Sequence, residues 1–130
     1  MYRDDAMILD ASAVLAYLHE EEGCLAVEKV LRGAFISTVN WSEVVQKLRL
    51  KGIDDKAIGQ ELSILGVSFI PFTQQHAEKA GELWQITSPF GLSLGDRACL
   101  ATALCEGLNV LTADKVWQAL PLDLHIHLIR

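Results

Sequence analysis

Short apolar runs alternate with helix-like repeats from one end of the sequence to the other, and this alternation constrains the fold more than any other feature. Residues 6–9 form such a run, and Val14, Leu15 and Leu18 follow at helical spacing. Strands separated by helices pair in parallel and carry helices on both faces of the sheet. We therefore expect an α/β fold, a three-layer α/β/α sandwich with a mainly parallel sheet of about five strands. The predicted strands are residues 6–9, 34–37, 67–72, 109–114 and 122–129, the last at an edge and parallel or antiparallel to its neighbour.

Polar caps and glycines mark the predicted ends of the helices. Ser12 is the expected N-cap of the first helix, and Thr38 or Asn40 is that of the helix after the second strand. Thr73 is expected to begin a helix that continues to about Ile86. Further expected landmarks are a cap at Asp54 and stops at Gly23, Gly33, Gly52, Gly66 and Gly107.

Length and composition predict one folded domain. The 130 residues and 51% hydrophobic content suffice for one packed core, which we expect to cover residues 1–130. No apolar run approaches the roughly 18 residues that a membrane span needs. The beginning, MYRDDAMILD, carries acids where a secretion signal would be basic. We expect a cytoplasmic protein without a membrane partner.

Charge and cysteine content narrow the possible functions. The net charge of −6 argues against a protein that coats nucleic acid through a broad basic field. The three cysteines lack CxxC spacing, so we expect core residues rather than disulfides or a zinc site. The modest basic group Lys47, Arg49 and Lys51 is either a solvated helix end or a patch that contacts phosphate.

Four acidic residues occupy similar positions in the predicted fold. Asp10 ends the first strand, and Asp114 directly follows the fourth. Glu43 and Asp96 lie in the first turns of two helices. In a parallel sheet such junctions gather at the carboxyl ends of the strands, which is where these folds place their sites. The four carboxylates are therefore candidates for one common site.

Helix capping is a simpler explanation for each of these acids. Glu43 would complete a capping box with Asn40, and Asp96 would complete one with Ser93. An acid in the first turn of a helix is also stabilised by the helix dipole. The pattern of residues alone leaves both explanations open.

Coulomb repulsion decides what a convergent site would need. Carboxylates brought together raise one another's pKa unless cations lie between them. Ligands that are all oxygen, without His or Cys, indicate Mg²⁺ or Mn²⁺ rather than zinc. Ser12 and Thr112 each lie two residues from an acid, and we expect them to support the carboxylates.

Four segments of the sequence carry a resemblance to a known family. ILDASAVLAYL, ISTVNWSEVVQKL, LSLGDRACLATAL and VLTADKVWQAL resemble, in order, the four motifs of PIN-domain ribonucleases. The IHLIR ending also resembles the VapC toxin branch. The resemblance spans nearly the whole chain and places the family's acids on Asp10, Glu43, Asp96 and Asp114. One departure is Gly95, where the family suggests Ala; glycine there would add flexibility to the first turn.

The resemblance implies a metal-dependent endoribonuclease. A water activated by Mg²⁺ or Mn²⁺ would cleave the phosphodiester bond of an RNA substrate, without a protein nucleophile. The resemblance to VapC also implies a toxin that a VapB-like antitoxin inhibits, and a homodimer.

Two alternatives from other classes remain at this point. A PIN-like binding module without catalysis would keep the same fold, and only an activity assay separates it from a nuclease. A phosphate-accepting receiver domain has a similar length and fold but needs an acceptor Asp after the third strand, where this sequence has FIPFT. Arg97 is either a phosphate contact or a surface residue, and we expect Trp41 and Trp117 to pack rather than to stack on bases. His125 and His127 share one face of the last strand, which fits an exposed sheet edge.

Overall fold

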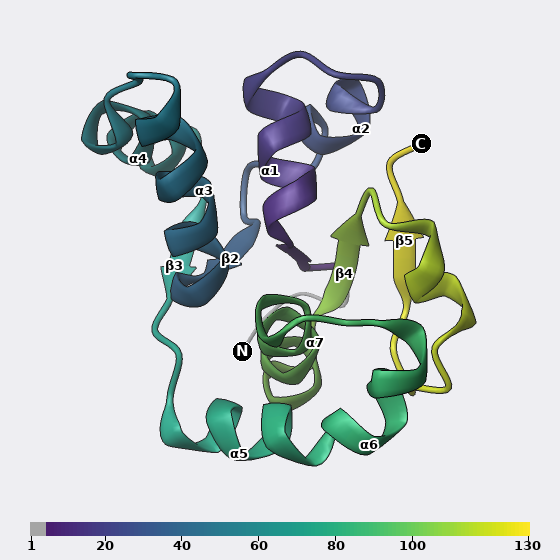
Figure 1. Ribbon diagram of the computed structural model, residues 1–130. Helices are drawn as coiled ribbons and strands as arrows, with labels where there is room; N and C mark the ends of the chain where they lie inside the picture. Colours follow the sequence, from purple (N-terminus) through teal and green to yellow (C-terminus); the bar gives the residue numbers. More distant parts are fainter. Residues whose placement is uncertain (1–4) are drawn as a thin grey trace.

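A five-stranded parallel sheet forms the centre of the computed structural model, which describes residues 5–130 (Figure 1). The strand order is β3-β2-β1-β4-β5, and every neighbouring pair is parallel. The strands are β1 (Met7–Leu9), β2 (Phe35–Ser37), β3 (Ser68–Ile70), β4 (Asn109–Thr112) and β5 (Ile126–Leu128). The helices are α1 (Ala11–Leu18), α2 (Cys24–Glu28), α3 (Thr38–Leu50), α4 (Asp55–Ile64), α5 (Gln74–Glu82), α6 (Trp84–Thr87) and α7 (Leu94–Glu106), with 3₁₀ turns η1 (Ser88–Phe90) and η2 (Lys115–Ala119).

Two hydrophobic cores lie on opposite faces of the sheet and confirm the predicted three-layer sandwich. Successive residues of a strand point to opposite faces, so Leu9 joins the core under α1 to α4 and Ile8 joins the core under α5 and α7. In β4, Leu111 belongs to the first of these cores and Val110 to the second. The short strands are apolar on both faces because helices cover both.

The pairing of β1 with β4 determines where the candidate site forms. Leu9 lies opposite Leu111, so the two strands end at the same level of the sheet. The N–H of Asp10 donates to the carbonyl of Leu111 at 3.3 Å and extends this pairing by one residue. Asp10 and Thr112 therefore emerge side by side at the carboxyl edge of the sheet.

The first and third helices begin earlier than the sequence predicts. Asp10, not Ser12, is the N-cap of α1, and its carboxylate accepts from the N–H of Ala13. Ser37, rather than Thr38 or Asn40, caps α3 by accepting from the N–H of Val39. In both cases the residue at the strand end caps the helix, so strand and helix follow each other with no intervening loop. The predicted caps at Asp54 and Thr73 are confirmed.

The later part of the chain follows the prediction, with one difference in the helix after the third strand. The helix that begins after Thr73 ends at Glu82, and α6 and η1 continue it as separate short turns. The last strand is an edge strand, as expected, and pairs in parallel with β4. His127 in this strand and His125 just before it are exposed, in agreement with the sheet-edge interpretation. Within residues 5–130, no helix combines the length and apolar character that a membrane crossing requires.

Gly23, just before α2, lies against the backbone of Ile129, and its substitution tests this contact. A Cβ at Gly23, where φ is +94°, would lie 2.6 Å from the carbonyl oxygen of Ile129. Gly33 has a similar φ of +87° but open space around it. We expect Gly33→Ala to cost about 1 kcal/mol of unfolding free energy from backbone strain alone. Gly23→Ala should cost about 1–3 kcal/mol more, because the backbone of Ile129 must move.

Urea denaturation of both variants measures this difference directly. Equal losses for Gly23→Ala and Gly33→Ala would contradict the close contact between Gly23 and Ile129.

Candidate active site

Asp10 is the most buried of the acidic candidates and lies at the centre of a hydrogen-bond network. Its side chain is only 4% exposed. Ser12 Oγ lies 2.7 Å from Asp10 Oδ1 and 2.9 Å from Oδ2, and Thr112 Oγ1 donates to Oδ2 at 2.7 Å. The N–H of Ala13 donates to Oδ1 at 2.9 Å. These donors fix the position of the carboxylate at the ends of β1 and β4.

The predicted supporting residues Ser12 and Thr112 also connect the two loops of the site. Ser12 Oγ accepts from the N–H of Ala113 at 3.0 Å, and Thr112 Oγ1 accepts from the N–H of Asp114 at 3.0 Å. Each hydroxyl therefore accepts from the β4 loop while it faces Asp10. The loop after β4 is held against the start of α1.

Burial raises the pKa of Asp10 from 3.8 to about 6. Hydrogen bonds from Thr112, Ala13 and Ser12 oppose this shift, while the charge of Asp96 adds to it. Desolvation is the largest cause, so the network only partly compensates for the loss of water. The molecule thus holds a carboxylate at this edge of the sheet at an energetic cost.

Glu43, a residue of α3, is held close to the start of α7. Asn40 Nδ2 donates to Glu43 Oε1 at 2.8 Å and to the carbonyl of Gly95 at 3.0 Å. Asn40 lies inside α3 rather than at its cap, so the predicted capping box between Asn40 and Glu43 is wrong. The amide instead forms a bridge from Glu43 to the first turn of α7.

Gly95 has a role that its place in the sequence does not indicate. A Cβ at this position would lie 2.5 Å from Glu43 Oε2 and 2.7 Å from Oε1. The carboxylate of Glu43 therefore occupies the space that an alanine side chain would need. We expected only added flexibility from this glycine, and the structure shows that it makes room for an acid.

Asp96 is both a helix cap and a member of the acidic cluster. Its Oδ2 accepts from the N–H of Ser93 at 2.9 Å, and Ser93 Oγ accepts from the N–H of Asp96 at 3.2 Å. This confirms the predicted capping box at the start of α7. Asp96 Oδ1 makes no hydrogen bond with other residues in the described range, so one oxygen is available for further contacts.

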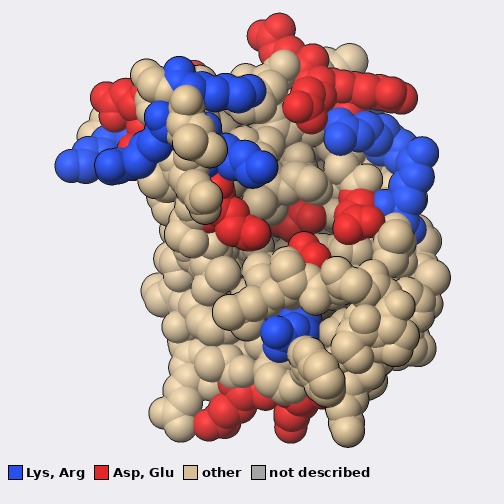
Figure 2. All heavy atoms as spheres, viewed as in Figure 1, with Lys and Arg blue, Asp and Glu red and all other residues tan. Residues whose placement is uncertain are grey.

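The buried thiol of Cys99 lies within electrostatic range of three of the acids. Desolvation raises the pKa of Cys99 well above its usual value, and the charges of Asp10, Asp96 and Glu43 raise it further. Cys99 lies on the buried face of α7. Figure 2 shows acidic side chains gathered at the centre of this face of the molecule, with basic side chains above them.

The fourth acid, Asp114, lies beside this cluster and caps the turn η2. Its Oδ1 accepts from the N–H of Val116 at 3.1 Å, and the residue is half-buried. Its N–H reaches the Asp10 network through Thr112. Asp10, Glu43 and Asp96 thus lie within electrostatic range of Cys99, and Asp114 is connected to Asp10 through Thr112.

The donors at this site fit a hard divalent cation. Within residues 5–130, no three His, Cys, Asp or Glu side chains are already close enough together to hold a metal ion. The acids are oxygen ligands. Burial is the main cause of the raised pKa values of Asp10 and Cys99, and the negative charge of Asp96 on Asp10, and of Asp10, Asp96 and Glu43 on Cys99, raises them further. The buried Asn40 Oδ1 has no hydrogen-bond partner among the described residues and adds another oxygen beside Glu43. A bound cation would neutralise part of the charge of the acids, and a carbonyl oxygen such as Asn40 Oδ1 is a ligand that a hard cation accepts.

Arg97 points away from the acidic cluster. Its Nη1 donates to the carbonyl of Ala80 at 2.8 Å, which joins α7 to α5. The half-buried guanidinium therefore has a packing role in this structure rather than that of a phosphate contact.

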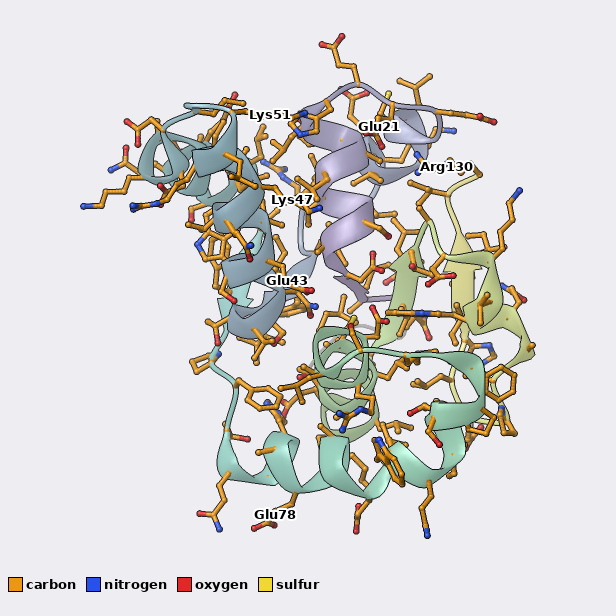
Figure 3. All side chains as sticks on the ribbon, in the orientation of Figure 1. Glu21, Glu43, Lys47, Lys51, Glu78 and Arg130 are labelled. Carbon is orange, nitrogen blue, oxygen red and sulfur yellow. The ribbon has the colours of Figure 1, made fainter. Side chains whose placement is uncertain are left out.

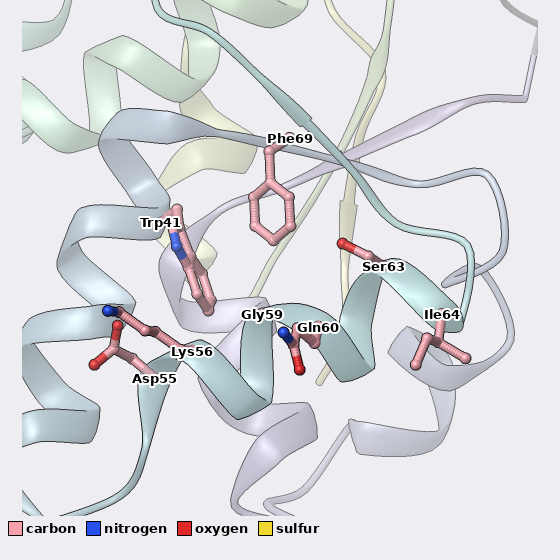
Figure 4. A pocket seen from close by; sticks show the side chains of 8 residues that line it. All are labelled: Trp41, Asp55, Lys56, Gly59, Gln60, Ser63, Ile64 and Phe69. Atoms are coloured by element: carbon pink, nitrogen blue, oxygen red, sulfur yellow. The ribbon is translucent and has the colours of Figure 1, made fainter.

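Both tryptophans beside the motifs pack against other residues, as predicted. Trp117 is fully buried. Trp41 packs against Phe69 with ring centroids 5.0 Å apart and lies over Gly59 of α4 in a surface pocket (Figure 4).

The sequence model of the PIN domain family matches residues 7–121 of this chain. The chain belongs to the PIN domain family. The match includes every element that carries an acid of the cluster. A comparison with curated proteins gave no match.

Solved PIN domain structures share the fold over almost the whole chain. A toxin-antitoxin complex from Klebsiella pneumoniae is 21% identical with a TM-score of 0.77, covering 95% of this chain and 98% of that chain. DNA-bound VapBC from Salmonella typhimurium is 15% identical with a TM-score of 0.73, covering 97% and 99%. VapC20 from Mycobacterium tuberculosis, a toxin that cleaves the sarcin-ricin loop, is 20% identical with a TM-score of 0.67, covering 87% and 93%.

The raised pKa of Asp10 predicts a pH-dependent stability for the metal-free PIN domain. An acid whose pKa is higher in the folded state stabilises the fold below its unfolded pKa, and this contribution is lost as pH rises through the folded value. For a change from 3.8 to about 6, the loss is roughly 3 kcal/mol. Asp10→Asn, which keeps an N-cap side chain, should therefore gain about 2 kcal/mol relative to wild type between pH 4 and pH 8, because part of the loss has already occurred at pH 4.

Denaturant unfolding in EDTA across this pH range measures the difference. Asp54→Asn, at the exposed N-cap of α4, is the matched control. A gain for Asp10→Asn that is the same at pH 4 and at pH 8 would rule out the raised pKa.

Gly95→Ala tests whether this glycine positions Glu43. The carboxylate lies at the end of a flexible side chain and can move, so the fold should remain within about 1 kcal/mol of wild type. Displacement of Glu43 from Asn40 should weaken Mn²⁺ binding about tenfold. Isothermal titration calorimetry measures the binding. Gly81→Ala, in open space on α5, is the control, and unchanged Mn²⁺ affinity in Gly95→Ala would contradict the positioning role.

Proposed function

We propose that this PIN domain protein is a metal-dependent endoribonuclease. In this proposal Asp10, Glu43 and Asp96 hold Mg²⁺ or Mn²⁺, and Asp114 completes the acidic group. The observation that supports it most strongly is geometric: Ser12, Thr112 and Ala13 hold Asp10 at the carboxyl edge of the sheet. On the other side, Asn40 joins Glu43 to the first turn of α7, the helix that carries Asp96. Fixed oxygen ligands around a cation are the arrangement that phosphodiester hydrolysis by metal ions needs.

The chain's own residues provide the fixed part of such a site. A bound divalent ion supplies positive charge for the scissile phosphate and lowers the pKa of a water molecule. Asp10 keeps one geometry because Ser12, Thr112 and Ala13 donate to it. The bridge from Asn40 holds Glu43 from the opposite side.

The cysteine at the centre of the site does not compete as a nucleophile. Cys99 is fully buried, and burial together with the surrounding acids keeps its pKa well above the usual value. A thiol is reactive as the thiolate, which this environment disfavours. This environment of Cys99 supports attack by water rather than by the thiol.

We further propose that the protein is a cytoplasmic toxin inhibited by a VapB-like antitoxin. The similar structures include a toxin-antitoxin complex from Klebsiella pneumoniae and DNA-bound VapBC from Salmonella typhimurium. A groove of about 620 Å³ lies between the α1–α2 region and α4 and has both apolar and acidic walls. Such a groove fits an amphipathic helix with basic flanks. Its lining residues are Tyr17, Leu18, Glu20, Cys24, Leu25, Glu28, Ile58 and Glu61.

A homodimer is part of the same proposal. Ile64 is 85% exposed and Leu50 is 79% exposed, and both belong to the α3–α4 region. Large apolar side chains this exposed are candidates for burial in an interface.

Cleavage of structured RNAs by antitoxin-free protein tests the nuclease proposal. Wild type in Mg²⁺ or Mn²⁺ should give specific cuts that EDTA abolishes. Asp96→Asn should cut at least about a hundredfold more slowly, because a ligand of the cation is lost. Glu78→Gln, on the exposed far side of α5, is the matched control and should cut like wild type.

The outcomes separate the nuclease from a catalytically silent PIN domain. Cuts that persist in Asp96→Asn would contradict the proposed site. Folded wild-type protein that binds Mn²⁺ but cuts none of the RNAs, transfer RNAs included, would favour the silent binding module.

A further inference from the structure

A groove along the outer face of α1 shares Ser12 with the hydrogen-bond network of Asp10. Ser12, Leu15 and His19 recur once per turn of α1 and form its floor. The groove has a volume of about 380 Å³. Ser12 also contacts the carboxylate of Asp10, so one end of the groove reaches the candidate metal ligands.

The α3 side of this groove carries two lysines in line with Glu43. Glu43, Lys47 and Lys51 are four residues apart along the chain, which places them on one face of α3. With a rise of 1.5 Å per residue, successive members are about 6 Å apart along the helix axis. Positive charge therefore continues upward from the acidic cluster along one wall (Figure 3).

Contacts distinguish these lysines from the neighbouring arginine. Lys47 and Lys51 are exposed and make no ion pair with other described residues. Arg49, between them in sequence, pairs with Asp55 at 3.0 Å and does not line the groove. The basic group at the end of α3 thus divides into two lysines that face the groove and one arginine engaged with α4.

Arg130 provides a cation on the opposite side of α1. Its Nη1 donates to the carbonyl of Glu22 at 2.9 Å and lies 3.3 Å from Glu21 Oε1. These contacts leave the other guanidinium donors available at the groove (Figure 3). Glu21 also lines the groove, so its lining carries three cations and one carboxylate and remains positive in a chain of net charge −6.

We propose that this groove binds the backbone of single-stranded RNA next to the scissile phosphate. Lys47, Lys51 and Arg130 contact successive phosphates on one side of the cleaved bond, and His19 offers a ring against which a base can stack. The helix α1 has eight residues and a length of about 12 Å, so the floor seats only a few nucleotides. This proposal rests on the nuclease function and adds the path that its substrate follows.

The salt dependence of RNA binding tests this path without any cleavage. Binding of a fluorescent single-stranded RNA is measured by anisotropy in EDTA at several salt concentrations. The variant Lys47→Ala/Lys51→Ala/Arg130→Ala should bind more weakly at low salt. The slope of log affinity against log salt should fall by about two, since each lost phosphate contact removes about 0.7 for a single strand.

A second triple variant controls for the change in net charge. Lys29→Ala/Arg49→Ala/Lys56→Ala removes the same charge from exposed positions outside the groove. It should keep the slope of wild type. Equal slopes for the two triple variants would overturn the proposal, and they would leave the groove to an acidic peptide or another ligand.

Asp96→Asn separates failure of this inference from failure of the nuclease function. The three groove substitutions are therefore made both in wild type and in Asp96→Asn. If they lower the salt slope equally in the two proteins, the RNA path is supported even when no RNA is cut. If wild type cuts RNA but its slope is independent of the three cations, the nuclease function holds and the path is wrong. In a cutting protein, the groove variant should raise KM more than it lowers kcat.

Discussion

The parallel pairing of β1 with β4 is the contact on which the candidate site depends. It places the end of one strand beside the end of another that is 102 residues away in the chain, as the bond between Thr112 and Asp10 records. Ser12 and Ala13, which are near Asp10 in the chain, supply part of the hydrogen bonding to its carboxylate. The bond from Thr112 of β4 does not exist until the sheet has formed. The site and the central sheet therefore form together. A substitution that disturbs the pairing of β1 with β4 also disturbs the site, and the reverse holds as well.

Capping and site formation turn out to be compatible roles for the same carboxylates. Asp10 accepts from the N–H of Ala13 as a cap while Ser12 and Thr112 hold it within the cluster. Asp96 uses Oδ2 for its capping box and retains Oδ1. A carboxylate has two oxygens with several lone pairs, so one oxygen satisfies the helix while the group still acts on its surroundings. The choice between caps and a convergent site, which the sequence left open, was not a choice between exclusive structures.

The sequence predicted those features that depend on neighbouring residues or on the rules of parallel sheets. Apolar runs located the strands, and the position of Asp10 and Asp114 at strand ends located the acids. Contacts between distant elements were not predictable in this way. Asn40 looked like a cap because its pattern is local, while its actual partners include the carbonyl of Gly95 on another helix. Arg97 was ambiguous for the same reason, since only the packing of α7 against α5 fixes its direction.

The close approach of Gly95 to Glu43 has a consequence for substitution at either position. The two positions share one volume, because the carboxylate fills the space beside the α carbon of the glycine. A side chain at position 95 requires the carboxylate at position 43 to turn aside, whereas glycine lets it lie against the backbone of α7. The two positions are therefore coupled in space, although one belongs to α3 and the other to α7.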